Sequence, residues 1–228
     1  MASLKIEPLQ HGELDDYIKV CWAAFEPLEA DMVMPMMYPN GLQPDVIDLM
    51  KTRIVRETEG KLGDLCFCAK DVQTGEVVAV SRWALNEHPP STAEEIDAEY
   101  NKVKKARYGG TPVAGANSEL GEAFLRALIY SEHETMRGQP YMCLRLLATH
   151  PRYHRKGAGS MLLRQGLEKA DRLGLPTYLD ASVNGKPLYE RNGFNTIGVI
   201  PFDGRRYGGR SEGKHAIMVR PAQGLEKQ

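Results

Sequence analysis

The chain has 228 residues, of which 42% are hydrophobic, and its formal net charge at pH 7 is −1. This length and composition allow a sizeable core, in one large domain or two small ones. A near-neutral chain has no general attraction to polyanions, so we do not expect it to bind nucleic acid. No run approaches the ~20 apolar residues that span a membrane, and the N-terminus lacks the apolar core of a signal peptide.

The cysteines indicate a reducing compartment. Cys21, Cys66, Cys68 and Cys143 are scattered through apolar segments. Cys66 and Cys68 have one residue between them, whereas common zinc and redox motifs have two. We therefore expect buried, reduced thiols in a cytoplasmic protein without a metal.

Alternating and helical patterns follow each other through the first 85 residues. Val77–Val80 is an apolar run typical of a strand buried on both faces, and it leads to Trp83, which we interpret as a core residue. Met32, Met34, Met36 and Met37 lie in a proline-bearing segment and can fill core gaps or border a ligand. The predicted elements are a strand at 4–9, a helix beginning near 14, a helix at 44–57 and a hairpin of strands at 64–70 and 76–85.

The segment 87–116 interrupts this pattern. It opens with His88-Pro89-Pro90 and contains a short polar helix at 93–100. A loop of this length is unusual in a compact domain, so we expect a functional insertion or a lid. Ser118 is then expected to cap a helix that runs to about Met136.

The most informative stretch runs from Met142 to Gly174. An apolar strand is stopped by His150-Pro151, a basic glycine turn follows, and Leu163, Leu167 and Ala170 then repeat at helical spacing. A glycine turn that opens a helix exposes backbone N–H groups at the positive end of the helix dipole. The pattern therefore predicts an anion site suited to phosphate or pyrophosphate.

The motif at this turn is neither of the two common nucleotide motifs. A Walker sequence is absent, and Leu162 stands where a dinucleotide fingerprint has its third glycine. The run His154-Arg155-Lys156-Gly157-Ala158-Gly159 instead resembles the Gln/Arg-x-x-Gly-x-Gly/Ala signature of GNAT N-acetyltransferases. His154 departs from it, because Gln or Arg is usual there, and its charge depends on pH.

A second match to the same family lies downstream. Leu188-Tyr189-Glu190-Arg191-Asn192-Gly193-Phe194 is similar to the family's Leu-Tyr-x-x-x-Gly-Phe segment, and Ser182 stands where an asparagine is common. The resemblance implies one α/β (α+β) domain over residues 1–228. Its mixed, mostly antiparallel sheet would have about seven strands, flanked by helices and splayed between the fourth and fifth.

The resemblance also implies acetyl-CoA as co-substrate and direct acetyl transfer without an acyl-enzyme, which leaves Cys143 in the core. Tyr189 is the implied general acid, and backbone N–H groups near 147–149 would polarise the thioester carbonyl. The general base stays open between His150, Glu26, Glu29, Glu119, Glu122 and Asp180. The expected coenzyme-binding residues are Leu147, Ala148, Thr149, His154, Arg155, Lys156, Gly157, Ala158, Gly159, Ser160 and Ser182.

The acceptor is harder to predict. Arg145 and the basic segment 205–210 carry positive charge without an obvious structural need, so Arg145, Arg206 and Glu26 are the candidate acceptor-binding residues, and an acceptor with a carboxylate is one hypothesis. We expect an N-acetyltransferase acting on a small amine, as a monomer or homodimer. The alternatives are a protein N-terminal or lysine acetyltransferase and a non-catalytic acyl-CoA-binding module. Strands at 195–201 and 215–220 complete the predicted elements.

Overall fold

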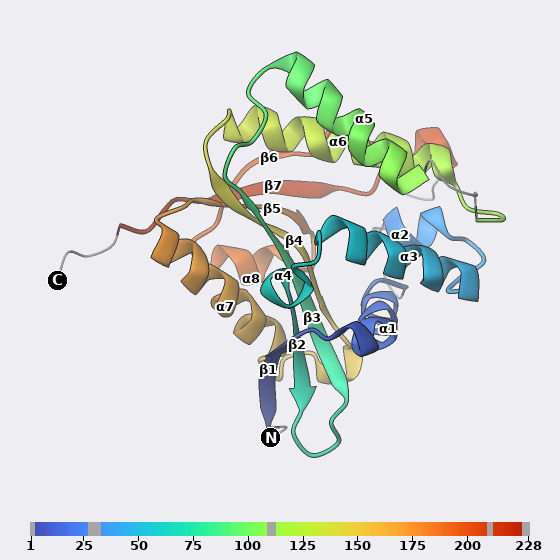
Figure 1. The fold of residues 1–228 in the computed structure, drawn as a ribbon, viewed down its shortest axis with the longest axis vertical. Coiled ribbons are helices and arrows are strands. Elements are labelled where there is room, and N and C mark those ends of the chain that lie inside the picture. Colours follow the sequence, from blue (N-terminus) through green and yellow to red (C-terminus); the bar gives the residue numbers. More distant parts are fainter. Residues whose placement is uncertain (1–2, 27–32, 109–112, 209–211, 225–228) are drawn as a thin grey trace. The chain divides into compact units, whose positions relative to one another are not determined.

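The computed structural model describes residues 3–26, 33–108, 113–208 and 212–224 (Figure 1). Seven strands form a mixed, mostly antiparallel sheet in the order β1-β2-β3-β4-β5-β7-β6, with β4 parallel to β5. This confirms the expected fold class. The strands are β1 Leu4–Pro8, β2 Cys66–Asp71, β3 Val77–Asn86, β4 Tyr141–Thr149, β5 Thr177–Ser182, β6 Asn195–Val199 and β7 His215–Arg220. The helices are α1 Leu14–Phe25, α2 Val33–Met37, α3 Pro44–Glu57, α4 Leu62–Leu65, α5 Ala93–Tyr108, α6 Ser118–Met136, α7 Ala158–Leu173 and α8 Lys186–Glu190.

The chain divides into two compact units. The first contains residues 1–27, 42–84 and 144–169, and the second contains residues 28–41, 85–143 and 170–228. One domain over residues 1–228 therefore stays a prediction.

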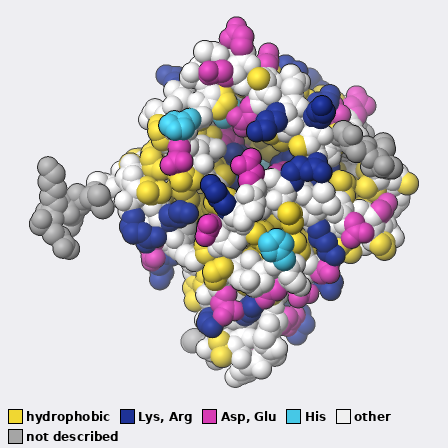
Figure 2. Space-filling view, in the orientation of Figure 1, with side chains coloured by type: hydrophobic (Ala, Val, Ile, Leu, Met, Phe, Trp, Pro, Cys, Tyr) yellow, Lys and Arg dark blue, Asp and Glu magenta, His cyan; other side chains and the backbone are white. Residues whose placement is uncertain are grey.

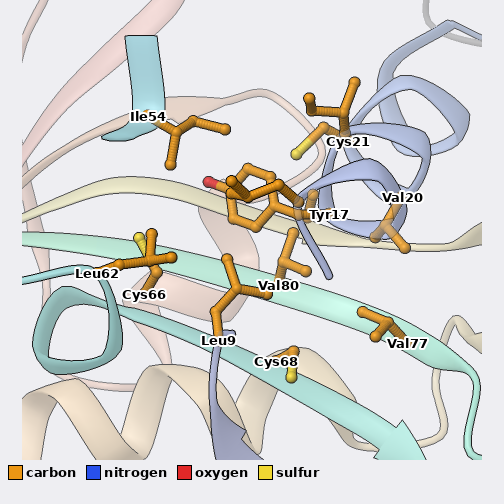
Figure 3. Close-up of a cluster of buried hydrophobic side chains, with 13 residues drawn as sticks. Leu9, Tyr17, Val20, Cys21, Ile54, Leu62, Cys66, Cys68, Val77 and Val80 are labelled. Carbon is orange, nitrogen blue, oxygen red and sulfur yellow. The ribbon is translucent and has the colours of Figure 1, made fainter. Parts of the chain in front are cut away.

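The first unit is built on the β2–β3 hairpin, with β1 antiparallel to β2. Alternate residues of β2 face opposite sides, as a strand requires. Cys66 and Cys68 pack with Tyr17 of α1 and Ile54 of α3 (Figure 3). Ala69 packs on the other side, in a cluster with residues of α7. Figure 1 likewise shows α1 and α7 on opposite sides of these strands.

Helix α7 is seated on β3 through one glycine. Gly166 is buried, and a Cβ atom added to it would lie 2.0 Å from the ring of Trp83. Trp83 is 2% exposed, which agrees with its predicted core role. The absence of a side chain at Gly166 is what lets the indole lie against the helix.

The second unit contains an antiparallel β5-β7-β6 sheet and the α5–α6 pair. Tyr100 of α5 packs with Leu125 and Ile129 of α6. The insertion is more ordered than expected, because α5 has 16 residues where only a helix at 93–100 was predicted. The predicted cap of α6 was wrong by one residue: the side chain of Asn117, not Ser118, accepts the hydrogen bond from the Leu120 N–H.

The surface carries charges of both signs. Lys and Arg side chains are interspersed with Asp and Glu on the face drawn in Figure 2. None of the described helices combines the length and apolar character needed to cross a membrane. All four cysteines are free and buried, as predicted.

Candidate coenzyme and acceptor sites

The basic turn between β4 and α7 has the backbone geometry of an anion site. A 3-10 turn at Pro151–Tyr153 leads into Arg155 and Gly157, whose φ angles are 60° and 92°. Both values lie in the left-handed region, which glycine adopts readily and arginine rarely. The N–H of Met161 donates to the Gly157 carbonyl at 3.0 Å. The preceding N–H groups, at 158–160, have no intrahelical acceptor and are available to an anion.

The side chains of this turn are mostly exposed cations. His154, Arg155 and Lys156 are exposed, and so is Gly157. His154 Nε2 lies 3.0 Å from the Thr149 carbonyl oxygen, to which it donates. In the neutral ring this leaves Nδ1 as an acceptor, so His154 gains a second N–H for a phosphate only when it is protonated. The predicted coenzyme residues 154–160 are thus contiguous around one helix N-terminus.

Two residues that the sequence analysis missed hold this turn. Tyr153 is buried, and its hydroxyl donates to Asp71 Oδ2 at 3.0 Å. Lys156 Nζ lies 4.4 Å from the centroid of the Tyr153 ring. Asp71 ends β2, far from the turn in sequence, so no local pattern indicated the pair.

His150 has a structural role at the end of β4. Its N–H donates to the Val78 carbonyl at 2.9 Å, and its Nδ1 accepts from the Arg152 N–H at 3.2 Å. A neutral imidazole that accepts at Nδ1 carries its hydrogen on Nε2. In this state Nε2 is a donor, whereas a general base needs a free lone pair there.

The neighbouring residues of β4 face alternate sides. Leu147 packs with the α7 cluster, and Ala148 packs with the α1 cluster. Thr149 is half-buried and gives its carbonyl to His154. Arg145 is exposed in the middle of the strand, whereas Cys143 is 2% exposed, which agrees with its predicted core role.

In the second unit, Tyr189 is held by a compact turn. Ser182 Oγ accepts from the Gly185 N–H at 3.2 Å, just before α8. A Cβ atom on Gly185 would lie 3.1 Å from the Tyr189 ring, and that ring makes an edge contact with Phe194 at 5.8 Å. Burial raises the pKa of Tyr189 well above its usual range, because the phenolate would be poorly solvated. The side chain therefore stays protonated at neutral pH.

A group of aromatic rings lies beside the N-terminal half of α6; Phe124, Phe202 and Tyr207 are half-buried and His215 is buried. Phe124 meets Phe202 at 5.0 Å and His215 at 5.2 Å, and Phe202 stacks on Tyr207 at 6.1 Å. Met36 and Met37 of α2 approach the same region, at Gly213 and Gly121. We call Phe124, Phe202, Tyr207, His215, Met36 and Met37 the aromatic cluster. The sequence analysis singled out the methionines but not the rings.

The arginines of the basic segment have different environments. Arg205 forms a two-pronged ion pair with Asp203, at 2.9 Å for both contacts, and also pairs with Glu212 at 2.8 Å. The expectation that this segment lacks a structural need for its charge is therefore wrong for Arg205. Arg206 is exposed, and Arg210 lies outside the described residues.

The rival carboxylates for the base are dispersed. Glu26 is exposed at the C-terminal end of α1, and Glu119 is exposed in the first turn of α6. Glu122 pairs with Lys104, and Asp180 accepts from the Tyr178 hydroxyl at 2.7 Å. Glu29 lies outside the described residues. Within the described ranges, no three His, Cys, Asp or Glu side chains are grouped so that they could hold a metal ion.

Comparison with solved structures identifies the fold. An arylalkylamine N-acetyltransferase-like protein from mosquito matches with a TM-score of 0.66 and 16% identity, covering 96% of this chain and 99% of the other. A polyamine N-acetyltransferase from Drosophila melanogaster matches with a TM-score of 0.64 and 16% identity, and the match covers 95% of this chain and 98% of the other. A protein from Corynebacterium glutamicum, described as a histone acetyltransferase and related acetyltransferase, matches at 0.57 and 20%, covering 99% of each chain. No curated protein sequence matches the chain significantly.

The model of the acetyltransferase (GNAT) family matches residues 77–194, which is more than half of the chain. The match includes both the basic turn before α7 and the Tyr189 segment. The chain therefore belongs to the GNAT family of acetyltransferases.

Proposed function

We propose that this acetyl-CoA-dependent acyltransferase is an N-acetyltransferase that acts on the primary amine of a small molecule with an apolar or aromatic part. The observation that carries the coenzyme half of this proposal is the turn at 154–160. There, two left-handed residues, the exposed cations Arg155 and Lys156, the exposed His154 and the first N–H groups of a 16-residue helix come together. Oriented N–H groups and positive charge are what a pyrophosphate requires.

Acetyl transfer needs a polarised carbonyl and a proton for the departing thiolate. Backbone N–H groups near 147–149 are proposed to polarise the thioester carbonyl, as in an oxyanion hole. Tyr189 is proposed to protonate the thiolate. Burial raises the pKa of Tyr189, which keeps the phenol protonated across the physiological range and at the same time makes it a weaker acid. Ser182 supports α8, and thereby Tyr189, through its hydrogen bond to Gly185.

The base is proposed to be a carboxylate, directly or through water. For His150 to act at Nε2, its ring would have to change tautomer and give up the hydrogen bond from Arg152. Glu26 makes no side-chain hydrogen bond or ion pair with the part of the chain that the structure describes, and it is exposed at the end of α1. We therefore place Glu26 before His150 as candidate base.

The aromatic cluster supports an acceptor with an apolar part. Half-buried rings and methionines offer a surface on which an apolar group can pack, and the solved relatives include enzymes named for arylalkylamines and polyamines. An acceptor with a carboxylate is less favoured than the sequence suggested, because Arg205 is already paired with two carboxylates. Arg145 and Arg206 remain candidate partners for such a group.

A protein substrate is the second candidate, because the Corynebacterium glutamicum relative is described as a histone acetyltransferase. The experiment measures release of coenzyme A thiol with a panel of arylalkylamines, polyamines, amino acids with their amides, and lysine peptides. Turnover with an amine and not with the peptides supports the proposal, and the reverse result supports the alternative. Binding of acetyl-CoA without turnover of any acceptor favours the non-catalytic module.

The coenzyme site has its own test. Coenzyme A at 100 times its dissociation constant should stabilise the protein by about 2.7 kcal/mol. We expect Gly157→Asp to abolish this thermal shift, because it puts a side chain and a negative charge at the anion site, and we expect the same of Gly159→Asp. Gly174→Asp is the matched control. Gly174 also has a left-handed φ of 63° and open surroundings, but it lies at the other end of α7. An unchanged shift in folded Gly157→Asp would contradict this placement.

A further inference from the structure

The basic turn has one buried side chain among exposed neighbours. Tyr153 is 6% exposed, whereas Arg152, His154, Arg155 and Lys156 are all exposed. Its ring packs with Ala158 and Leu162 of α7 and with Ala69 and Val78 of the β2–β3 hairpin. Tyr153, which directly precedes the proposed phosphate site, therefore also packs that turn against the sheet.

The hydroxyl of this tyrosine has a rigid acceptor. Asp71 accepts the Tyr153 hydroxyl at Oδ2, and its Oδ1 accepts the Gln73 N–H at 2.9 Å. The Asp71 N–H itself donates to the Glu76 carbonyl, so the carboxylate belongs to an ordered turn. These hydrogen bonds, led by the one from Gln73, lower the pKa of Asp71, so the acceptor is ionised at neutral pH.

The ring of Tyr153 also sets the place of one cation. Lys156 Nζ lies 4.4 Å from the ring centroid, and the Lys156 N–H donates to the Tyr153 carbonyl at 3.3 Å. An ammonium over an aromatic face is attracted by the ring electrons. The same tyrosine thus restrains both the backbone of the turn and the charge of Lys156.

We infer that Tyr153 and Asp71 are positioning residues for the phosphates of the coenzyme. They touch no reacting atom in this role. The hydroxyl–carboxylate hydrogen bond ties the turn and Lys156 to the β2–β3 hairpin, so that the N–H groups at 158–160 and the ammonium are preorganised before the coenzyme binds. The inference rests on the proposed coenzyme site.

Four variants separate the contribution of the Tyr153–Asp71 hydrogen bond from that of the Tyr153 ring. Tyr153→Phe keeps the ring under Lys156 and removes the hydrogen bond, and Asp71→Ala removes the acceptor. Asp71→Asn keeps an oxygen acceptor and is the conservative rescue. Tyr130→Phe is the matched control, because the Tyr130 hydroxyl also donates to an aspartate, Asp97, but in the α5–α6 pair.

The measurement compares acetyl-CoA with S-acetylpantetheine, which has the same thioester but no phosphates. Tyr153→Phe and Asp71→Ala should each raise the KM for acetyl-CoA about 3- to 10-fold, the range expected for one hydrogen bond. They should leave kcat/KM for S-acetylpantetheine unchanged. The double variant should be no worse than either single one, and both Asp71→Asn and Tyr130→Phe should resemble the wild type.

Two outcomes would overturn the inference. Equal losses with both thioesters would mean that the link only supports folding, and unchanged KM values for acetyl-CoA in both Tyr153→Phe and Asp71→Ala would mean that it positions nothing. A wild-type protein that binds no coenzyme A would instead refute the coenzyme site itself, so the two failures are distinguishable.

Discussion

The hydroxyl of Tyr17 is buried and makes no hydrogen bond within the described residues. The residue is 2% exposed. In Figure 3 the oxygen points toward Ile54, within an apolar cluster that also contains Cys21. Burial raises the pKa of this tyrosine well above its usual range. An unpaired buried hydroxyl costs free energy that an apolar ring does not.

We therefore predict that Tyr17→Phe raises the free energy of unfolding by about 1 kcal/mol. Urea denaturation of the two proteins measures the difference. Tyr178→Phe is the contrasting control, since the Tyr178 hydroxyl donates to Asp180 and its removal should destabilise the protein. A loss of stability in Tyr17→Phe would contradict the prediction and would mean that the hydroxyl makes a favourable interaction in solution.

Tyr189 is the residue on which the proposed chemistry depends. Tyr189→Phe removes the proposed proton donor and keeps the ring beside Phe194. We expect kcat to fall by ~10²-fold with the KM for acetyl-CoA nearly unchanged. Because the pKa of Tyr189 is raised, the wild-type rate should show no loss below pH 10 that is due to this group. Full activity of the phenylalanine variant at saturating substrate would assign the proton to water or to another residue.

At the scale of elements, the packing of α7 on β3 decides whether Gly166→Ala stabilises or destabilises the protein. In an isolated helix, glycine to alanine is favourable by about 1 kcal/mol. At Gly166 the added methyl would meet three ring atoms of Trp83, two of them at 2.0 Å. We predict that Gly166→Ala lowers the free energy of unfolding by at least about 2 kcal/mol, the usual scale of overpacking.

A second glycine provides the comparison. Gly121 of α6 would meet the ends of two flexible side chains, Met37 and Tyr108, which can move aside at lower cost. Gly121→Ala should therefore destabilise less than Gly166→Ala in the same denaturation assay. In a protein that carries Trp83→Leu, Gly166→Ala should lower the free energy of unfolding by less than it does in the wild type. If the effects of the two changes simply add, the contact between Gly166 and Trp83 does not cause the loss.

The charges of the whole molecule predict its response to acid. Hydrogen bonds from Lys5 and Lys70 lower the pKa of Glu7 to about 2, and Arg205 lowers that of Asp203. Backbone N–H groups lower the pKa values of Asp71 and Glu95. A carboxylate with a depressed pKa contributes stability above its unfolded-state pKa of about 4 and loses it as pH falls through the folded-state value.

We thus expect the free energy of unfolding to decrease steadily from about pH 4.5 toward pH 2. Urea titrations at several pH values measure how steeply the free energy of unfolding changes with pH. Glu7→Gln should make this change less steep. Because Glu7, Glu95 and Asp203 are at least partly exposed, added salt should weaken their share of the pH dependence, whereas Asp71 is buried and should be screened less. A constant free energy over this interval would mean that the ion pairs do not persist in solution.

Local patterns in the sequence predicted much of the fold. The helix at Pro44–Glu57 and the strand at His215–Arg220 occur with the predicted bounds, because periodicity, the starting proline of α3 and flanking glycines are local signals. The β2–β3 hairpin and the strand–turn–helix unit of β4 and α7 were likewise predictable. The glycines and cations at 154–159 indicated an anion site by their residue types and spacing alone. The paired motifs around Gly157 and Tyr189 indicated the family.

Contacts between distant segments were decided only by the tertiary structure. Nothing near Tyr153 in the sequence points to Asp71, and nothing near Gly166 points to Trp83, because each pair meets only when β2 and β3 pack against α7. The same holds for the rings that meet between α6 and the segment before β7. A side chain's hydrogen-bonding role depends on which partner the fold brings to it. Residue type and spacing therefore predicted the kind of site, and packing selected the residues that hold it in place.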